Sequence, residues 1–351
     1  MLKAGILGGT GYMGGEVLKV LLEHPDTRVA WATSRQKGTI GDYHPNLMYE
    51  SIPIIPPEEI TACDVVFLAL PTGSSFQYVE KLLAWGCKVV DLGADYRLKD
   101  RTLWERTYKM PHPCWDLADE AVYGIPEINR ALIRRARLVA NPGCFSSAAI
   151  FGVLPFLKAN LVDESRIVVD GLSGTAGAGN DLCRPMHHPE IGGNVVSYNV
   201  VGHRHTHEME QVLGPYAGGK VVVHFTPAYI PIVRGIHTTC HLFPRRPVTV
   251  QDLADAVSSC YRDEPFVRLW ALGKEDSGAW QYRPYPWVST TSGTNFCYVG
   301  FDCDEERGRI VVFSVLDSIG KGGAHAAIQN MNLMFGLEET RGLMRRGSHP
   351  L

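Results

Sequence analysis

Apolar residues in the first half of the chain fall into short continuous runs, separated by segments in which they recur at helical spacing. The first run is Leu2–Leu7, and the next apolar residues, at 17, 18, 21 and 22, share one helix face. Short runs without alternation are typical of strands buried on both faces of a parallel sheet. Further runs lie at 28–33, 64–71, 88–92 and 138–140, with a helix at 76–84. The pattern predicts a doubly wound α/β domain.

The second half of the chain has a different pattern, in which β-rich runs predominate and fewer helices separate them. These runs lie at 166–172, 220–229, 237–243, 295–302 and 309–316. They predict a mixed sheet in an α+β domain. A chain of 351 residues is long enough for two domains. We expect one domain at 1–143, joined by a C-terminal helix within about 318–351, and a second at 144–317.

One long segment has little periodicity. Between Trp104 and Pro126 the chain is rich in proline, aromatic and charged residues. We expect it to form an excursion over the surface or at an interface.

A glycine-rich segment follows the first apolar run. Gly9, Gly11 and Gly14 fit the pattern G-x-G-x-x-G between a strand and a helix, where backbone can approach a pyrophosphate over the helix N-terminus. A structural glycine turn is the alternative. The strand at 28–33 is followed by Ser34-Arg35-Gln36-Lys37 and not by an acidic residue. Hydroxyl and cationic groups suit a 2′-phosphate, which favours NADP over NAD; the alternative is a solvated basic loop.

Other loops are expected at the carboxyl edge of the same sheet, where doubly wound domains bind ligands. Pro71 and Ser74 follow the strand at 64–71 and are candidate cofactor neighbours. Arg97 follows the next strand, and it could bind an anion or form an ion pair with Asp95 or Asp100.

The segment Asn141-Pro142-Gly143-Cys144 predicts a turn after the last strand of the first domain, with a helix running on to about Leu157. Cys144 would then lie at a helix N-terminus. The helix dipole and unpaired N–H groups favour a thiolate there and can hold an oxyanion. A small buried cysteine in a turn is the alternative.

Two further segments offer polar chemistry in the second half. The loop from Ser173 to Gly179 consists of small residues, and it could wrap a phosphate with backbone N–H groups or simply turn. His203, His205 and His207 alternate, so they share a face only if the segment is extended. Without a usual ligand spacing we expect no metal, and we expect a histidine to serve as general acid and base for a thiol.

Composition narrows the class of protein. The formal net charge is −3 and no basic arm is present, which argues against nucleic acid as a partner. The longest apolar run is too short to cross a membrane, and the chain opens directly into a strand. Nine scattered cysteines without a Cys-x-x-Cys pair indicate reduced thiols. We therefore expect a cytoplasmic protein that needs neither a membrane nor a disulfide framework.

Several blocks, in this order, resemble one known family. They are Gly8–Gly14, Ser34-Arg35, Asp91–Leu98, Asn141–Phe145, Ser173-Gly174 with Gly177–Gly179, His203–His205, Val233–Gly235 and Gln329–Asn332. The chain is similar to N-acetyl-γ-glutamyl-phosphate reductases over almost its whole length. The resemblance implies NADPH-dependent reduction of an acyl phosphate to an aldehyde in arginine biosynthesis, with release of inorganic phosphate. It also implies a fold like that of aspartate-semialdehyde and glyceraldehyde-phosphate dehydrogenases, and a homodimer or homotetramer.

The same resemblance implies roles for individual residues. Cys144 stands where the family has its nucleophile, and His205 is placed as the acid and base, with His203 as the competing candidate. The NADP(H) contacts it implies are Gly8, Thr10, Gly11, Tyr12, Met13, Gly14, Ser34, Arg35, Gln36, Pro71, Ser74, Ser173, Gly174 and Asn330. The substrate contacts are Asn141, Arg97, His203 and Arg204.

The chain departs from the family pattern at two places. Ser146-Ser147 follow the aromatic residue after Cys144, and the late block reads Asp317-Ser318-Ile319-Gly320-Lys321-Gly322. Both departures bear on the nicotinamide-side contacts.

Two alternative functions stay open. A sister group reduces a carrier-bound aminoadipyl phosphate in lysine biosynthesis, and His44–Leu47 and His187–Glu190 look like that group. A non-catalytic NADP-binding regulator is the other alternative. It would need no cysteine at a helix N-terminus.

Overall fold

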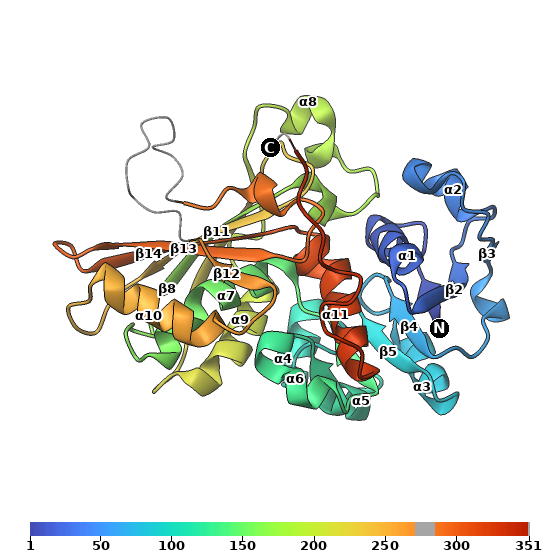
Figure 1. Ribbon diagram of the computed structural model, residues 1–351, viewed down its shortest axis with the longest axis horizontal. Helices are drawn as coiled ribbons and strands as arrows, with labels where there is room; N and C mark the ends of the chain where they lie inside the picture. The colour runs from blue at the N-terminus through green and yellow to red at the C-terminus, as the bar shows by residue number, and fades with distance from the viewer. Residues whose placement is uncertain (271–284, 350–351) are drawn as a thin grey trace. The chain divides into compact units, whose positions relative to one another are not determined.

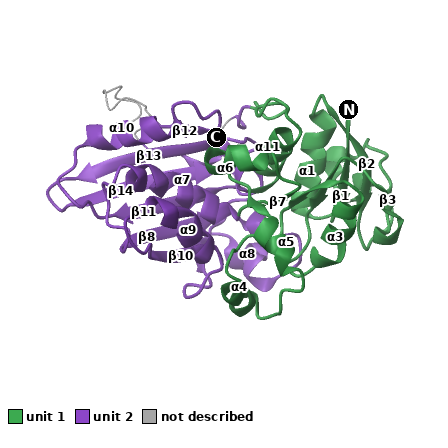
Figure 2. Ribbon diagram, turned by 90° about the horizontal axis from the view of Figure 1, so that it is seen from below, with its two compact units in different colours: residues 1–142, 323–345 green, residues 143–322, 346–351 purple. Residues whose placement is uncertain are grey.

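The computed structural model describes residues 1–270 and 285–349, and the chain divides into two compact units (Figures 1 and 2). Unit 1 consists of Met1–Pro142 and Gly323–Arg345, and unit 2 of Gly143–Gly322 and the residues from Arg346 onward. The C-terminal return to unit 1 thus starts at Gly323 rather than at about residue 318, because the turn before it packs beside Cys144 in unit 2. Residues 350–351 of the expected C-terminal segment lie outside the described residues.

Unit 1 is built on a parallel sheet with the strand order β3-β2-β1-β4-β5-β7-β6. Its strands are β1 (Leu2–Leu7), β2 (Thr27–Thr33), β3 (Ile54–Ile55), β4 (Val65–Leu68), β5 (Lys88–Asp91), β6 (Val122–Tyr123) and β7 (Leu138–Ala140). Its helices are α1 (Tyr12–Glu23), α2 (Ile40–Tyr43), α3 (Phe76–Ala84), α4 (Arg101–Tyr108), α5 (Trp115–Glu120), α6 (Pro126–Ile133) and α11 (His325–Met334). β1 lies between β2 and β4, so the strand order reverses there, and in doubly wound sheets ligands bind at the carboxyl ends of the strands beside such a reversal.

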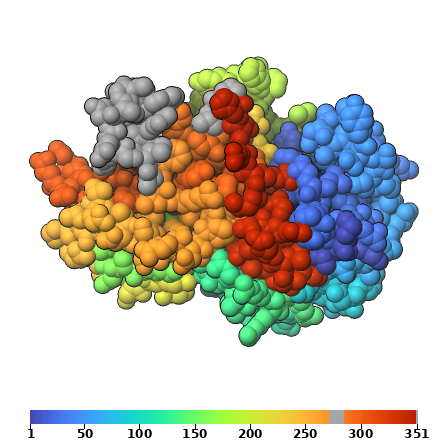
Figure 3. All heavy atoms as spheres, in the orientation of Figure 1, coloured from blue at the N-terminus to red at the C-terminus, as the bar shows by residue number. Residues whose placement is uncertain are grey.

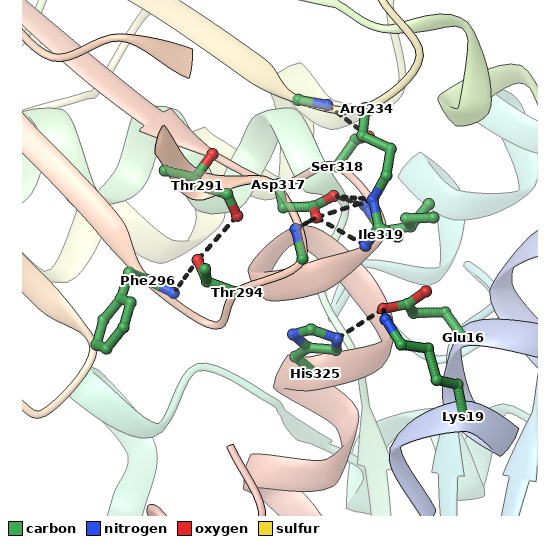
Figure 4. A network of polar contacts seen from close by, with 12 residues as sticks. Glu16, Lys19, Arg234, Thr291, Thr294, Phe296, Asp317, Ser318, Ile319 and His325 are labelled. Carbon is green, nitrogen blue, oxygen red and sulfur yellow. Dashed lines mark hydrogen bonds and ion pairs between the residues drawn. The ribbon is translucent and has the colours of Figure 1, made fainter. Parts of the chain in front are cut away.

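The C-terminal helix α11 belongs to unit 1, where it packs against α1 (Figure 3, red beside blue). His325 at its start is fully buried, and its Nε2 lies 2.8 Å from Oε1 of Glu16 on α1 (Figure 4). Further along α11, Oδ1 of Asn332 accepts a hydrogen bond from Nε2 of His24 at 3.1 Å. These buried polar contacts fix a helix that is more than 300 positions away in sequence from α1.

Unit 2 contains a mixed sheet, with the order β12-β13-β14-β11-β8-β10-β9 in the described residues. The strands are β8 (Ile167–Ser173), β9 (Val196–Ser197), β10 (Val223–Tyr229), β11 (Ile236–Leu242), β12 (Val267–Leu269), β13 (Cys297–Asp304) and β14 (Arg309–Leu316). The helices are α7 (Cys144–Lys158), α8 (His188–Ile191), α9 (His205–Leu213) and α10 (Val250–Tyr261). Parallel and antiparallel pairs both occur in this sheet. The predicted fold, an α/β unit followed by an α+β unit, is confirmed.

The segment from Trp104 to Pro126 differs from the prediction of an irregular excursion. It contains α5 and β6, and α4 extends into it. Trp104 is fully buried, and its ring meets those of Phe76 and His112 edge to face at 5.7 and 4.7 Å. The segment therefore forms part of the unit 1 core, and its short helices were missed because their apolar residues face an aromatic cluster rather than a regular stripe.

Candidate active site

The glycine loop of unit 1 is shaped by close backbone contacts between β1 and α1. Gly8 has φ +87°, a conformation that side chains rarely adopt, and a Cβ on Gly14 would lie 2.2 Å from the carbonyl oxygen of Gly8. Gly11 is the N-cap of α1 and places no side chain over the first turn. The N–H groups at this helix end are therefore presented by bare backbone, which is the arrangement that fits a pyrophosphate.

A second loop approaches the glycine loop from the end of β2. The hydroxyls of Thr10 and Ser34 lie 2.8 Å apart, and Ser34 Oγ also accepts a hydrogen bond from the N–H of Gln36. Arg35, Gln36 and Lys37 are exposed. The structure thus brings the predicted pyrophosphate loop and the predicted 2′-phosphate loop together within unit 1.

The loop after β4, which carries Pro71 and Ser74, is held by two buried carboxylates that the sequence analysis did not select. Asp95 accepts hydrogen bonds from the N–H groups of Gly73 and Ser75, and Asp91 accepts one from the Ser75 hydroxyl at 2.7 Å. Burial raises the pKa of Asp91 to about 7, with repulsion from Asp95 as a second cause. The sequence signal that could have identified Asp91 is its place as the aspartate that ends an otherwise apolar strand.

Arg97 and two asparagines named as ligand contacts are also in unit 1 and are buried. The Arg97 guanidinium donates to the carbonyl of Leu92 at 2.9 Å. Asn330 donates to the carbonyl of Gly124 and to Oδ1 of Asn141, while Asn141 donates to the carbonyl of Gly323. The asparagines join α11 to the end of β7, so both have a structural role whatever ligand they contact.

In unit 2, Cys144 is the first residue of α7, as the turn chemistry predicts. Gly143 is the N-cap, and no side-chain cap covers this helix end. A Cβ on Gly143 would lie 2.3 Å from Nε2 of His205, so only glycine allows the imidazole to lie this close to the residue before the cysteine. The structure therefore brings the start of α7 and the start of α9 together.

Glu208, which the sequence analysis missed, completes this arrangement. It is fully buried on α9, and its carboxylate accepts hydrogen bonds from the N–H of Gly143 at 3.0 Å and from the Ser146 hydroxyl at 3.1 Å. Its Oε1 lies 3.8 Å from Nε2 of His205. The i, i+3 spacing of His205 and Glu208 places them on one helix face, which was the available signal.

The two serines that depart from the family pattern have local partners. Ser147 donates a hydrogen bond to the carbonyl of Gly143 at 3.1 Å, and the single hydroxyl hydrogen of Ser146 is shared between this carbonyl, at 2.8 Å, and the Glu208 carboxylate. Both serines are buried. They therefore stabilise the turn that presents Cys144.

His203 differs from His205 in its hydrogen bonding. Its Nδ1 accepts the N–H of His205 at 3.1 Å, which requires that this nitrogen carries no proton. Burial, and second the positive charge of Arg204, lower the pKa of His203 to about 4. A histidine held neutral in this way is a poor proton acceptor at neutral pH.

Aromatic side chains surround this histidine pair. Tyr198 stacks on Tyr229, with ring centroids 4.3 Å apart, and the Tyr198 ring meets that of His203 at 5.7 Å. Burial raises the pKa of Tyr198, and the neighbouring Tyr229 acts in the same direction. Phe145 lies edge to face with both His203 and His205.

The small-residue loop after β8 is fixed by the segment before β11. Gly174 donates to the carbonyl of Gly235, and a Cβ on Gly174 would lie 2.6 Å from the carbonyl oxygen of Val233. Arg234 is directed at the carboxylate of Asp317, with Nε 2.9 Å from Oδ2 (Figure 4). Asp317 also accepts the N–H groups of Gly293 and Ile319. Asp317 begins the block 317–322, in which the chain departs from the family pattern. It thus organises the turn in which Gly322 packs against Cys144.

The described residues contain no group of histidine, cysteine and acidic side chains that could hold a metal ion. His205 and His207 are helical, so the alternating histidines do not share a face as they would in a strand. None of the nine cysteines, all of which lie in the described part of the chain, forms a disulfide with another described residue. Among the described residues no helix is long and apolar enough to cross a membrane.

Comparison with known proteins identifies the family. Models of two semialdehyde dehydrogenase domains match the chain, the NAD binding domain at residues 3–136 and the dimerisation domain at 144–318. The N-acetyl-gamma-glutamyl-phosphate reductase of Desulforudis audaxviator is 39% identical over 360 residues, which cover 100% of each chain. The reductase of the same name from Marinobacter nauticus is 41% identical and covers 98% of each. The chain belongs to the N-acetyl-γ-glutamyl-phosphate reductase family. The motif resemblance is confirmed, and with it the class of enzyme, an oxidoreductase.

Solved structures similar to the chain are aspartate-semialdehyde dehydrogenases. Enzyme II from Vibrio cholerae, complexed with ASA, has a TM-score of 0.70 at 17% identity and covers 96% of this chain and 98% of its own. The Candida albicans enzyme with NADP has a TM-score of 0.67 at 15% identity, over 95% and 98% of the two chains. The likeness in fold is confirmed. The family and its NAD binding domain indicate a nicotinamide dinucleotide as the cofactor class.

Proposed function

We propose that the chain reduces N-acetyl-L-glutamyl 5-phosphate to N-acetyl-L-glutamate 5-semialdehyde and phosphate, with NADPH, as a cytoplasmic enzyme of arginine biosynthesis. The observation that carries this proposal is the arrangement at the start of α7. Cys144 lies at an uncapped helix N-terminus, with His205 against Gly143 and the buried Glu208 beside His205. Relatives about 40% identical over the full length bear the name of this activity.

In the proposed mechanism His205 takes the proton of the Cys144 thiol. The negative charge of Glu208, 3.8 Å away, favours the imidazolium that results. The thiolate attacks the acyl carbon, the bond from that carbon to the phosphate oxygen breaks, and an acyl thioester remains on Cys144. N–H groups in the first turn of α7 stabilise the oxyanion formed during this attack.

When bound by unit 1, a nicotinamide dinucleotide would supply the hydride that reduces the thioester. The role of Cys144 is to hold the acyl group in place, so that this transfer becomes an intramolecular step. When the carbon–sulfur bond breaks, the aldehyde leaves and the proton held by His205 returns to sulfur. Arg97, Asn141, His203 and Arg204 are proposed as substrate contacts.

Preference for NADP(H) is proposed from the loop after β2. Ser34 is held against Thr10 by the 2.8 Å contact between their hydroxyls, while Arg35 projects as an exposed cation. A guanidinium is suited to paired hydrogen bonds with phosphate oxygens. Backbone and side-chain contacts from the glycine loop, Pro71, Ser74, Ser173, Gly174 and Asn330 would complete this site.

We also propose that the chain forms a homodimer or homotetramer through the sheet of unit 2. Helices α7, α9 and α10 pack on the sheet, and alternate strand residues that point away from them are half-buried. These half-buried residues include the apolar side chains of Leu172, Val311 and Phe313. A second copy would cover them. Val311→Asp should therefore lower the mass measured by light scattering to that of one chain.

The reaction is tested in the oxidative direction. The purified chain is given N-acetylglutamate semialdehyde or carrier-bound aminoadipate semialdehyde, with NADP⁺ or NAD⁺, with and without phosphate. The proposal expects phosphate-dependent NADP⁺ reduction with the first substrate and little with the second. Preference for the carrier-bound substrate would assign the enzyme to the sister group of lysine biosynthesis. Binding of NADP(H) without any turnover would favour a non-catalytic NADP-binding regulator.

A further inference from the structure

Gly15 is not explained by the dinucleotide motif, which needs only Gly9, Gly11 and Gly14. Gly15 lies in α1, where glycine weakens a helix relative to alanine by roughly 1 kcal/mol. A Cβ at this position would lie 2.4 Å from Cε1, 2.7 Å from Nδ1 and 2.8 Å from Nε2 of His44. The glycine therefore leaves room for the imidazole ring of His44.

His44 is placed by the short helix α2. Thr39 and Asp42 form a capping box at its start, and the N–H of His44 bonds to the carbonyl of Ile40 at its end. The His44 ring is buried, and its Nε2 lies 2.7 Å from the carbonyl oxygen of Gly9. Because a carbonyl can only accept, Nε2 must carry the hydrogen in this contact.

This hydrogen bond acts on a peptide plane in the middle of the glycine loop. Gly9 is held on its other side by its own N–H, which donates to the carbonyl of Thr33 at 2.8 Å. In a trans peptide the N–H of Thr10 points away from the carbonyl of Gly9. Drawing this carbonyl toward His44 therefore fixes the direction of the Thr10 N–H, in a loop whose N–H groups face the pyrophosphate.

We infer that His44 is a positioning residue, which pre-orients the glycine loop for the pyrophosphate of the dinucleotide. The same segment is tied to the loop after β2, because the Tyr43 hydroxyl donates to the carbonyl of Lys37 at 2.7 Å. α2 thus connects the two loops that would hold the pyrophosphate and the adenosine ribose. The inference needs only that unit 1 binds a nicotinamide dinucleotide, and it holds whichever acyl group the chain reduces.

The test compares His44→Leu, which fills similar space without a donor, with His44→Gln, whose amide nitrogen can reach a similar position. Kd for NADPH is measured by titration of the intrinsic tryptophan fluorescence, which does not require turnover. We expect His44→Leu to raise this Kd about threefold to tenfold, the effect of one net hydrogen bond. kcat at saturating cofactor and KM for the aldehyde should stay within twofold. His44→Gln should recover most of the affinity, and equal losses in both variants would contradict the inference.

His24 offers a matched control at the opposite end of α1. It is another buried histidine, bonded to Asn332, and it follows the last residue of the helix. His24→Gln should lower Tm without changing Kd for NADPH. If it weakened NADPH binding as much as His44→Leu does, the effect would be a general loss of stability, and the inference would be wrong.

A double-mutant cycle tests the pairing of His44 with Gly15. Gly15→Ala alone should weaken NADPH binding, because its methyl group displaces the ring. In the His44→Ala background the same change should cause no further loss, because the ring is gone. An equal loss in both backgrounds would show that Gly15 acts independently of His44 and would overturn this part of the inference.

Discussion

Helix α1 in unit 1 and helix α7 in unit 2 begin alike, but the side chains around their N-termini differ. Each follows a glycine N-cap without a side-chain cap, a short distance after a strand. At α1 the neighbours are glycines, the neutral hydroxyls of Thr10 and Ser34, and the imidazole of His44, which donates its Nε2 hydrogen to the Gly9 carbonyl. At α7 the neighbours are a thiol, an imidazole and the buried carboxylate of Glu208.

This difference corresponds to two functions of a helix N-terminus. A helix end that leaves its N–H groups to an external anion needs no charged side chain of its own, as at α1. A helix end that generates an anion within the protein needs a group to take the proton, as His205 is placed to do at α7. The predictions below test this division, beginning with the residue whose loss should have the largest effect.

The largest effect is expected at Cys144. Cys144→Ala should abolish turnover and leave Kd for NADPH unchanged, because the nucleophile is lost while unit 1 is untouched. Cys144→Ser should be nearly as inactive, since a hydroxyl is a far weaker nucleophile than a thiolate at neutral pH. Mass spectrometry of enzyme mixed with acyl phosphate, without NADPH, should find the acyl group on Cys144. An adduct on another cysteine, or appreciable turnover by Cys144→Ala, would contradict the proposed mechanism.

His205 is expected to be next. His205→Asn should lower kcat by about 10²- to 10⁴-fold with a modest change in KM, because proton transfer to and from the thiol is lost. His203→Asn should have a smaller effect on kcat, since His203 accepts a hydrogen bond from the N–H of His205 and its pKa is already low. The reverse order of the two losses would assign proton transfer to His203.

Glu208 should matter less than His205, because it acts through its neighbours. Glu208→Gln keeps the shape but removes the charge 3.8 Å from His205. We expect kcat to fall roughly 10- to 100-fold and the acidic limb of the kcat/KM profile to move to lower pH, since the imidazolium loses its stabilising partner. A fall in kcat without any movement of this limb would assign Glu208 only a structural role, through Gly143 and Ser146.

Arg35 tests the other helix end. Arg35→Ala removes a charge-assisted contact worth about 1.5 to 3 kcal/mol, so KM for NADPH should rise roughly 10- to 100-fold and KM for NADH should change little. Lys37→Ala removes the other cation of the same exposed loop, so comparing the two variants shows how the two cations share recognition of the 2′-phosphate. Equal rises for NADPH and NADH would show that Arg35 does not recognise the 2′-phosphate.

The two helix ends differ in how much of their structure could be predicted from the sequence. The glycine loop and the turn before Cys144 were predictable because local conformation alone dictates them. Glu208 and Asp317 were not, because their partners, Gly143 and Arg234, are distant in sequence and meet them only in the folded unit. His44 illustrates the same limit, since its position in the sequence gave no sign that its ring fills the space left by Gly15.

The smallest effect is expected at Asp91, beneath the loop that carries Pro71 and Ser74. Burial and the neighbouring Asp95 raise its pKa in the folded chain to about 7, from an ordinary value near 3.8. Ser75, Gly93, Arg97 and Tyr96 are its other polar or charged neighbours.

The Asp91 carboxyl binds its proton more tightly in the folded state than in the unfolded state. The stability that this protonation contributes is therefore present at acidic pH and is lost as pH rises toward 7. Asp91→Asn can still accept from Ser75 and Gly93 but cannot ionise, so it should show a smaller loss of Tm between pH 5 and pH 8, by a few degrees (roughly 2 to 3 kcal/mol). The exposed Asp119→Asn is the control for the loss of one negative charge in unit 1. If Asp91→Asn followed the parent's Tm across this range, Asp91 would be ionised in the folded chain at both pH 5 and pH 8. Its burial would then depend on Arg97 and the surrounding N–H groups rather than on a proton held by Asp91.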